Sequence, residues 1–185
     1  MHSAAMSFNF VGYFPKHIGP ATDAMGLPGV AEIWSVADCI SEGPENWINF
    51  WRHNAFGAYD TRELASSVIP ADRRHEFVIV AYRLWSEEFE SVGSRPIPNL
   101  ESLPSLELDE GYRAIGFDVV SASCGQFECS PLSCNGGAGQ YSANSHCLFS
   151  TLDEAFAAAV EFSRGGWEPG PYRVVEVLAP VDAHA

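Results

Sequence analysis

The sequence EFVIVAYRLW at residues 76–85 constrains the fold more than any other stretch of this chain. Its apolar residues run almost without interruption, and most are β-branched or aromatic, as in strands that are buried on both faces. A strand with one exposed face would alternate apolar and polar residues instead. The stretch therefore predicts a strand in the middle of a sheet.

Four other segments are predicted to be strands. Residues 7–14 are rich in aromatic side chains and partly alternate, and this strand should end at Pro15, which cannot donate a ladder hydrogen bond. The remaining three are residues 114–121, 147–150 and 172–178.

Two helices are predicted from apolar spacing in the first third of the chain. Residues 30–40 place apolar side chains at intervals close to those of a helix, and a second helix is expected after Pro44. The second pattern is aromatic, with Trp47, Phe50, Trp51 and Phe56. We interpret this stripe as core, because aromatic residues at helical spacing are more often buried than part of a ligand site.

Two further helices are predicted from capping boxes, in which an N-cap oxygen and a glutamate three residues later satisfy each other's backbone donors. The first box is Asp60 with Glu63, and it predicts a short helix over residues 61–68. The second is Thr151 with Glu154, and it opens a helix that Gly165 and Gly166 should stop.

These elements predict one α+β domain over residues 1–185, with a mixed or antiparallel sheet of about five strands and helices mainly on one face. Strands and helices come in clumps along the chain, which is typical of α+β proteins and not of doubly wound folds. Residues 86–110 are expected to form a long acidic loop, because prolines interrupt them. Residues 1–6 and 181–185 are expected to fray.

The charge is strongly unbalanced, with 24 acidic residues against 10 basic ones, a net charge of −14 and one lysine, Lys16. Nucleic acids and anionic membranes are bound through basic surfaces, so neither is an expected partner. An acidic surface attracts basic proteins instead. The simpler alternative is a solvated acidic surface without a specific partner.

The sequence predicts a cytoplasmic protein. The start of the chain lacks the basic and apolar regions of a signal peptide, and no apolar run has the length of a spanning helix. Five cysteines without an export signal are expected to be reduced thiols.

Four of these cysteines, Cys124, Cys129, Cys134 and Cys147, lie in one segment with the spacing C-x4-C-x4-C-x12-C. Structural zinc sites usually contain pairs of cysteines two residues apart, so we expect no metal and no cofactor here. If a metal were bound, these four thiols would be its ligands. Otherwise reduced cysteines behave as small buried hydrophobes.

A catalytic thiol is a second interpretation of this segment. Cys134 would be the nucleophile on a tight turn, His146 the base and Asn135 an orienting or oxyanion-binding residue. His17, His53 or His75 would be alternative bases, because a base must be near in space and not in sequence.

A recognition loop is the third interpretation. Residues 133–150 contain no Asp, Glu, Lys or Arg and are rich in amides and hydroxyls, which suit hydrogen bonding to a peptide or a polar small molecule. The candidate ligand-binding residues are Ser130, Ser133, Asn135, Gln140, Tyr141 and Asn144. The alternative is an ordered connection that satisfies its own backbone.

We therefore expect an acidic binding module of the inhibitor or immunity type, which holds a basic protein or a polar small molecule through the neutral loop and an acidic face. The alternative function is a cytosolic cysteine-dependent hydrolase or transferase centred on Cys134.

Overall fold

The computed structural model of the chain describes residues 8–22, 25–37, 52–90, 93–97, 100, 105–123 and 126–183. Its central strand is β6 (Tyr172–Pro180), which is buried along its whole length. β6 pairs antiparallel with β2 (Phe77–Trp85) along one edge and with β5 (Tyr112–Ser121) along the other. β2 also pairs antiparallel with β1 (Phe8–His17). The prediction of an interior strand at residues 76–85 is confirmed.

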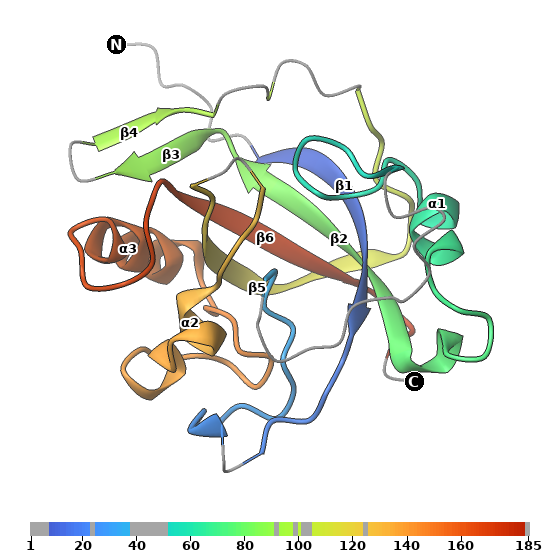
Figure 1. The fold of residues 1–185 in the computed structure, drawn as a ribbon, viewed down its shortest axis with the longest axis horizontal. Helices are drawn as coiled ribbons and strands as arrows, with labels where there is room; N and C mark the ends of the chain where they lie inside the picture. Colours follow the sequence, from blue (N-terminus) through green and yellow to red (C-terminus); the bar gives the residue numbers. More distant parts are fainter. Residues whose placement is uncertain are drawn as a thin grey trace.

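After β2 the chain forms a hairpin of β3 (Glu87–Glu90) and β4 (Gly93–Pro96). Phe89 of β3 pairs with Tyr172 of β6, so the six strands have the order β1-β2-β6-β3-β4, with β5 attached to β6 (Figure 1). The prediction of a loop over residues 86–110 is wrong for the part that forms β3 and β4. Pro96 is the last residue of an edge strand, where a missing backbone N–H is tolerated.

β1 runs through Pro15, although proline was expected to end it. It is an edge strand that pairs with β2, and its other side makes a bridge between Tyr13 and Tyr59. Gly12 allows this close approach, because a Cβ atom there would lie 2.5 Å from the carbonyl oxygen of Tyr59.

In the part of the chain that the structure describes, the helices are α1 (Arg62–Ser67), α2 (Pro131–Cys134) and α3 (Leu152–Phe162), together with the 3₁₀ turns η3 (Arg74–Glu76) and η5 (Gly137–Gly139). The capping box of Thr151 and Glu154 is confirmed at the start of α3. At α1 the N-cap is Thr61, whose hydroxyl accepts from the N–H of Leu64, and not Asp60 as predicted.

α1 and α3 pack on the same face of the sheet. Ala155 and Ala159 of α3 share a core cluster with Val174 of β6. Ala65 of α1 shares another with Leu178, which lies on the same face as Val174 because alternate residues of a strand do. Loops cover the opposite face. The α+β class with helices mainly on one face is therefore confirmed.

Two predicted elements differ in the structure. Residues 30–37 are not helical, so the helix predicted there is wrong. Ile33, Trp34 and Val36 are buried from an irregular segment, and their spacing matches that of a helix without a helix being present. Residues 147–150 do not form a strand, because Phe149 makes only isolated bridges, to Phe117 and Ala143.

Several predictions lie outside the described residues. These are the helix after Pro44 with Trp47, Phe50 and Trp51, the end of the 30–40 segment, residues 1–6, and Cys124. Among the residues that the structure does describe, no helix has the length and apolar character required to cross a membrane.

Candidate functional site

The cysteine loop, residues 122–148, leaves β5 and returns to it. At its start, the N–H of Ser121 donates to the carbonyl of Cys129 at 2.8 Å. At its end, Phe117 and Phe149 exchange two backbone hydrogen bonds of 2.9 and 2.8 Å. Because both ends are bonded to one strand, the loop is displayed from a rigid base. Leu132 of α2 and Ala138 of η5 share a core cluster with Ala155 of α3, and Figure 1 shows α2 near that helix.

A fully buried carboxylate, Asp118 of β5, fastens the start of this loop. It accepts hydrogen bonds from the N–H of Val36 at 2.6 Å, from the hydroxyl of Ser130 at 2.6 Å and from the N–H of Val119 at 2.8 Å. Burial raises the pKa of Asp118 to about 6, although these bonds and the nearby ammonium of Lys16 act in the opposite direction. Asp118 therefore joins β5, the 33–37 segment and the residue that precedes α2.

Three of the predicted ligand-binding side chains have partners inside the protein. Ser130 is fully buried, and Ser133 is 5% exposed and bonded to the hydroxyl of Ser35 at 2.8 Å. Asn144 donates to the carbonyl of Ile115 and accepts from two backbone N–H groups, which supports the left-handed backbone at Cys147. We conclude that these side chains hold the loop in shape.

The three residues predicted to act in catalysis have different neighbours. The thiol of Cys134 lies 3.7 Å from the carbonyl oxygen of Ala37. The amide of Asn135 is exposed and donates to Glu168 at 2.9 Å. The ring of His146 packs edge-on against Trp34, and its Nδ1 lies 4.0 Å from a carboxylate oxygen of Glu32. The described contacts do not join Cys134 to His146, so the catalytic assignment stays a prediction.

The remaining thiols are enclosed. Cys129 is 8% exposed and Cys147 is fully buried, whereas Cys134 is half-buried. Within the described ranges, no three His, Cys, Asp or Glu side chains are grouped so that they could hold a metal ion.

The outward part of the loop carries Gln140, which is exposed, and Tyr141, which is half-buried. The ring of Tyr141 contacts Phe162 of α3 and Trp167, at centroid distances of 5.2 and 5.9 Å. Burial raises the pKa of Tyr141 to about 12, and its hydrogen bond to Glu161 acts in the same direction. The tyrosine thus fixes the loop against the end of α3.

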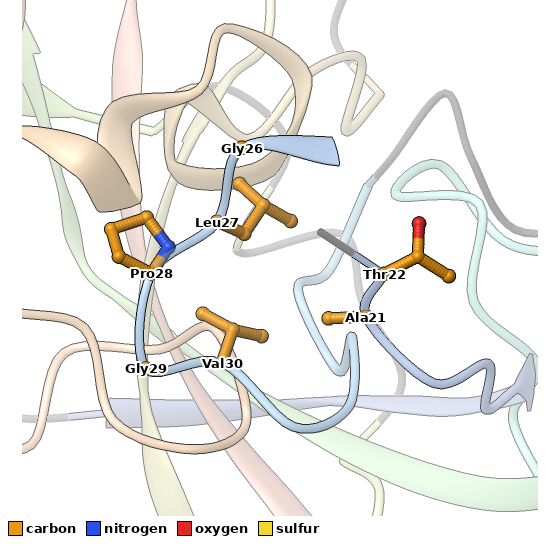
Figure 2. Close-up of a pocket in the computed structure, with 7 residues that line it drawn as sticks. All are labelled: Ala21, Thr22, Gly26, Leu27, Pro28, Gly29 and Val30. Carbon is orange, nitrogen blue, oxygen red and sulfur yellow. The ribbon is translucent and has the colours of Figure 1, made fainter. Parts of the chain in front are cut away.

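A hollow of about 340 Å³ adjoins the loop. Among the residues that the structure describes, its lining consists of Ala21, Thr22, Gly26, Leu27, Pro28, Gly29 and Val30, none of which is charged. Figure 2 shows the side chains of Leu27 and Val30 directed toward Ala21 across this space. The residues that follow the hollow in sequence are hydrogen-bonded to the cysteine loop. The N–H groups of Ala31 and Glu32 both donate to the carbonyl of Ser145.

Three carboxylates contact the loop: Glu32 at His146, Glu161 at Tyr141 and Glu168 at Asn135. Sequence reasoning did not select them, because all three are distant in sequence from the residues that they contact and nothing in their local pattern indicates the contact. The hollow was missed for a similar reason: glycines and prolines such as Gly26, Pro28 and Gly29 indicate turns but not the shape of the loop that contains them.

Charges of both signs are buried inside the described part of the protein, and the acidic ones are Glu88, Asp118 and Glu176. Lys16 and Arg173 are each 3% exposed. Among the described residues, ion pairs join Arg173 to Glu88, Arg83 to Glu176 and Arg73 to Glu76.

Comparison of the chain with protein-family models, with curated proteins and with solved structures finds no match in any of the three.

Proposed function

We propose that the protein is a protein-binding module, of the kind that an inhibitor or immunity protein represents, and that it holds a basic segment of its partner. The observation that carries this proposal is the hollow beside the neutral loop, whose described lining is uncharged, with Glu32, Glu161 and Glu168 around the same loop. An apolar side chain of the partner would enter the hollow. Lysine or arginine residues next to it would face the carboxylates.

The division of roles follows from the energetics of interfaces. A side chain that fills a hollow supplies most of the binding energy, whereas charges around it mainly steer association and select the partner. The exposed amides of Asn135 and Gln140 can hydrogen-bond to a partner backbone without the cost of desolvating a charge. A net charge of −14 favours a basic partner at long range.

Selection of phage-displayed random dodecapeptides tests this proposal even while the natural partner is unidentified. We expect enriched peptides to carry an apolar residue flanked by Lys or Arg. Ala21→Trp should fill the hollow and weaken their binding by about tenfold or more, as loss of a central anchor does. Ala71→Trp is the matched control, because Ala71 is exposed in a turn outside the hollow.

Glu161→Gln and Glu168→Gln should reduce the association rate and its dependence on salt more than the dissociation rate. Peptides that bind Ala21→Trp as well as they bind the native protein would contradict the proposed role of the hollow. Enrichment of acidic peptides would contradict the proposed partner class.

A cysteine-dependent hydrolase or transferase is the second candidate, because Cys134 is more exposed than Cys129 and Cys147. A catalytic thiolate reacts with iodoacetamide faster than free cysteine at neutral pH. Selective rapid labelling of Cys134, absent in Cys134→Ser, would favour this candidate over the binding module.

A further inference from the structure

A second hollow lies between α1 and η3, away from α3. It has a volume of about 430 Å³, and its lining residues are Arg62, Glu63, Ser66, Ser67 and Arg74. Two arginines of this acidic chain therefore line one open depression, together with two serines.

Buried residues of α1 and a turn after it position the residues that line this hollow. Ala65 and Val68 are fully buried and anchor α1 to the sheet. The chain then turns back, with the N–H of Arg73 donating to the carbonyl of Pro70, and this turn brings Arg74 beside α1. The guanidinium carbon of Arg62 lies 5.9 Å from the ring centroid of Tyr112, a cation–π contact that limits its motion.

Arg73, which is next to Arg74 in sequence, differs from the two arginines of the hollow because it is ion-paired. Arg73 forms a salt bridge of 2.7 Å with Glu76 and packs over Phe77. Within the described part of the chain, Arg62 and Arg74 form no ion pair, and Glu63 is the one acidic residue of the lining. The two guanidinium groups therefore keep their donors available to a ligand.

We propose that this hollow binds a phosphate monoester dianion. Guanidinium groups present forked N–H donors that match phosphate oxygens, and bonds between charged partners are the strong ones. The hydroxyl of Ser66 supplies a further donor, whereas that of Ser67 donates to the carbonyl of Leu64 at 2.7 Å. The ligand chemistry is shared by free phosphate esters and by a phosphorylated side chain of another protein.

The net charge of the chain sets the expected character of this binding. The net charge of −14 repels an anion at long range, and salt screens this repulsion, while Glu63 opposes the anion directly. Binding is accordingly weak for inorganic phosphate and sensitive to ionic strength.

The test is an amide NMR titration of the full chain with inorganic phosphate and with a short phosphoserine peptide, at constant ionic strength and with chloride as the reference anion. We expect saturable shifts at residues 62–67 and 74. Arg62→Ala and Arg74→Ala should each weaken binding about fivefold or more. Arg164→Ala is the matched control, since it removes the same charge from an exposed residue outside the hollow and should have little effect.

Glu63→Gln provides a test that does not depend on losing a side chain: it should tighten binding, whereas Glu87→Gln, an exposed glutamate on β3, should not. Tighter binding of the phosphopeptide than of phosphate would identify a phosphorylated protein as the source, and equal binding a free ester. Shifts that do not saturate, or equal effects of Arg164→Ala and Arg62→Ala, would overturn the proposal.

Discussion

Two buried carboxylates on neighbouring strands, Glu176 of β6 and Asp118 of β5, are stabilised in different ways. Glu176 is 7% exposed and forms a salt bridge with Arg83, which stands directly opposite it on β2 and whose side chain is 39% exposed. Asp118 is fully buried on the other face and accepts from two backbone N–H groups and one hydroxyl.

The difference lies in what each carboxylate joins. Glu176 and Arg83 connect two strands that the backbone ladder already connects, so their bond adds little to the topology. Asp118 connects β5 to Val36 and Ser130, which lie 82 and 12 residues away in sequence and on no common ladder. Backbone bonds hold both ends of the cysteine loop on β5, and Asp118 additionally fastens the start of the loop to β5 and to the 33–37 segment.

The largest effect is expected from Asp118→Asn, with Glu176→Gln as the matched variant. The new NH₂ group would face the N–H of Val36 or that of Val119, whichever way the amide turns, and hydrogen bonds to a charged acceptor are lost. We expect a loss of about 3–5 kcal/mol in unfolding free energy for Asp118→Asn. Glu176→Gln should cost about 1 kcal/mol, because its amide oxygen can still accept from Arg83 and Arg83 reaches water.

Urea unfolding of both variants measures this difference. Equal losses would show that the two carboxylates contribute alike and that Asp118 has no special role in holding the loop.

The second prediction concerns pH. Because the pKa of Asp118 is raised from 3.8 to about 6, its contribution to stability is fully present below pH 3.8 and is lost as the pH rises through 6. This contribution amounts to about 3 kcal/mol between these limits. The protonated form of Asp118 and the asparagine variant are both uncharged, but they are not equivalent. Both oxygens of the protonated acid can still accept from the N–H groups of Val36 and Val119, whereas an NH₂ group cannot accept. Greater stability at low pH is therefore compatible with a loss of stability in Asp118→Asn.

Unfolding free energies measured from pH 4 to pH 7 should therefore fall more steeply with pH for the native protein than for Asp118→Asn. Parallel curves would show that Asp118 does not titrate in this range.

A smaller effect is expected from Ser130→Ala, which removes one donor to Asp118 and the acceptor of the N–H of Ala37. We expect a loss of about 2 kcal/mol, and a further rise in the pKa of Asp118 because a bond that lowers it is gone. Arg83→Met is the matched change at the other carboxylate and should cost about 1 kcal/mol. Carboxyl NMR resonances of Asp118 measure the pKa, and an unchanged value would contradict the assigned bond.

The comparison also explains what the sequence could predict. β2 and β6 are both largely apolar and rich in β-branched residues, and α3 begins with a capping box. These local signals allowed all three elements to be predicted. The 30–37 segment carries a false helical period, because its apolar residues are buried by long-range bonds of Val36 and Trp34 that no local pattern encodes. The hollow and the carboxylates around the loop depend on the same long-range contacts.

The smallest effect is expected at the surface of the loop that Asp118 holds. Cys134→Ser should change the unfolding free energy by less than about 1 kcal/mol, because the thiol is half-buried and its contact with the carbonyl oxygen of Ala37 is long, at 3.7 Å. Asn135→Ala should behave similarly, since its amide is exposed. Val119→Ala, on the strand beneath, is the reference and should cost about 2–3 kcal/mol through lost burial.

Peptide binding should show the reverse order. Asn135→Ala should weaken the peptides selected on the native protein by a few fold, because its amide lies beside Glu168 on the proposed surface. Val119→Ala should leave the affinity of the folded fraction unchanged, since its side chain lies in the core. Should Cys134→Ser destabilise the fold as much as Val119→Ala while binding is unaffected, Cys134 is a core residue, and Asp118 then holds a packed connection in place and not a displayed surface.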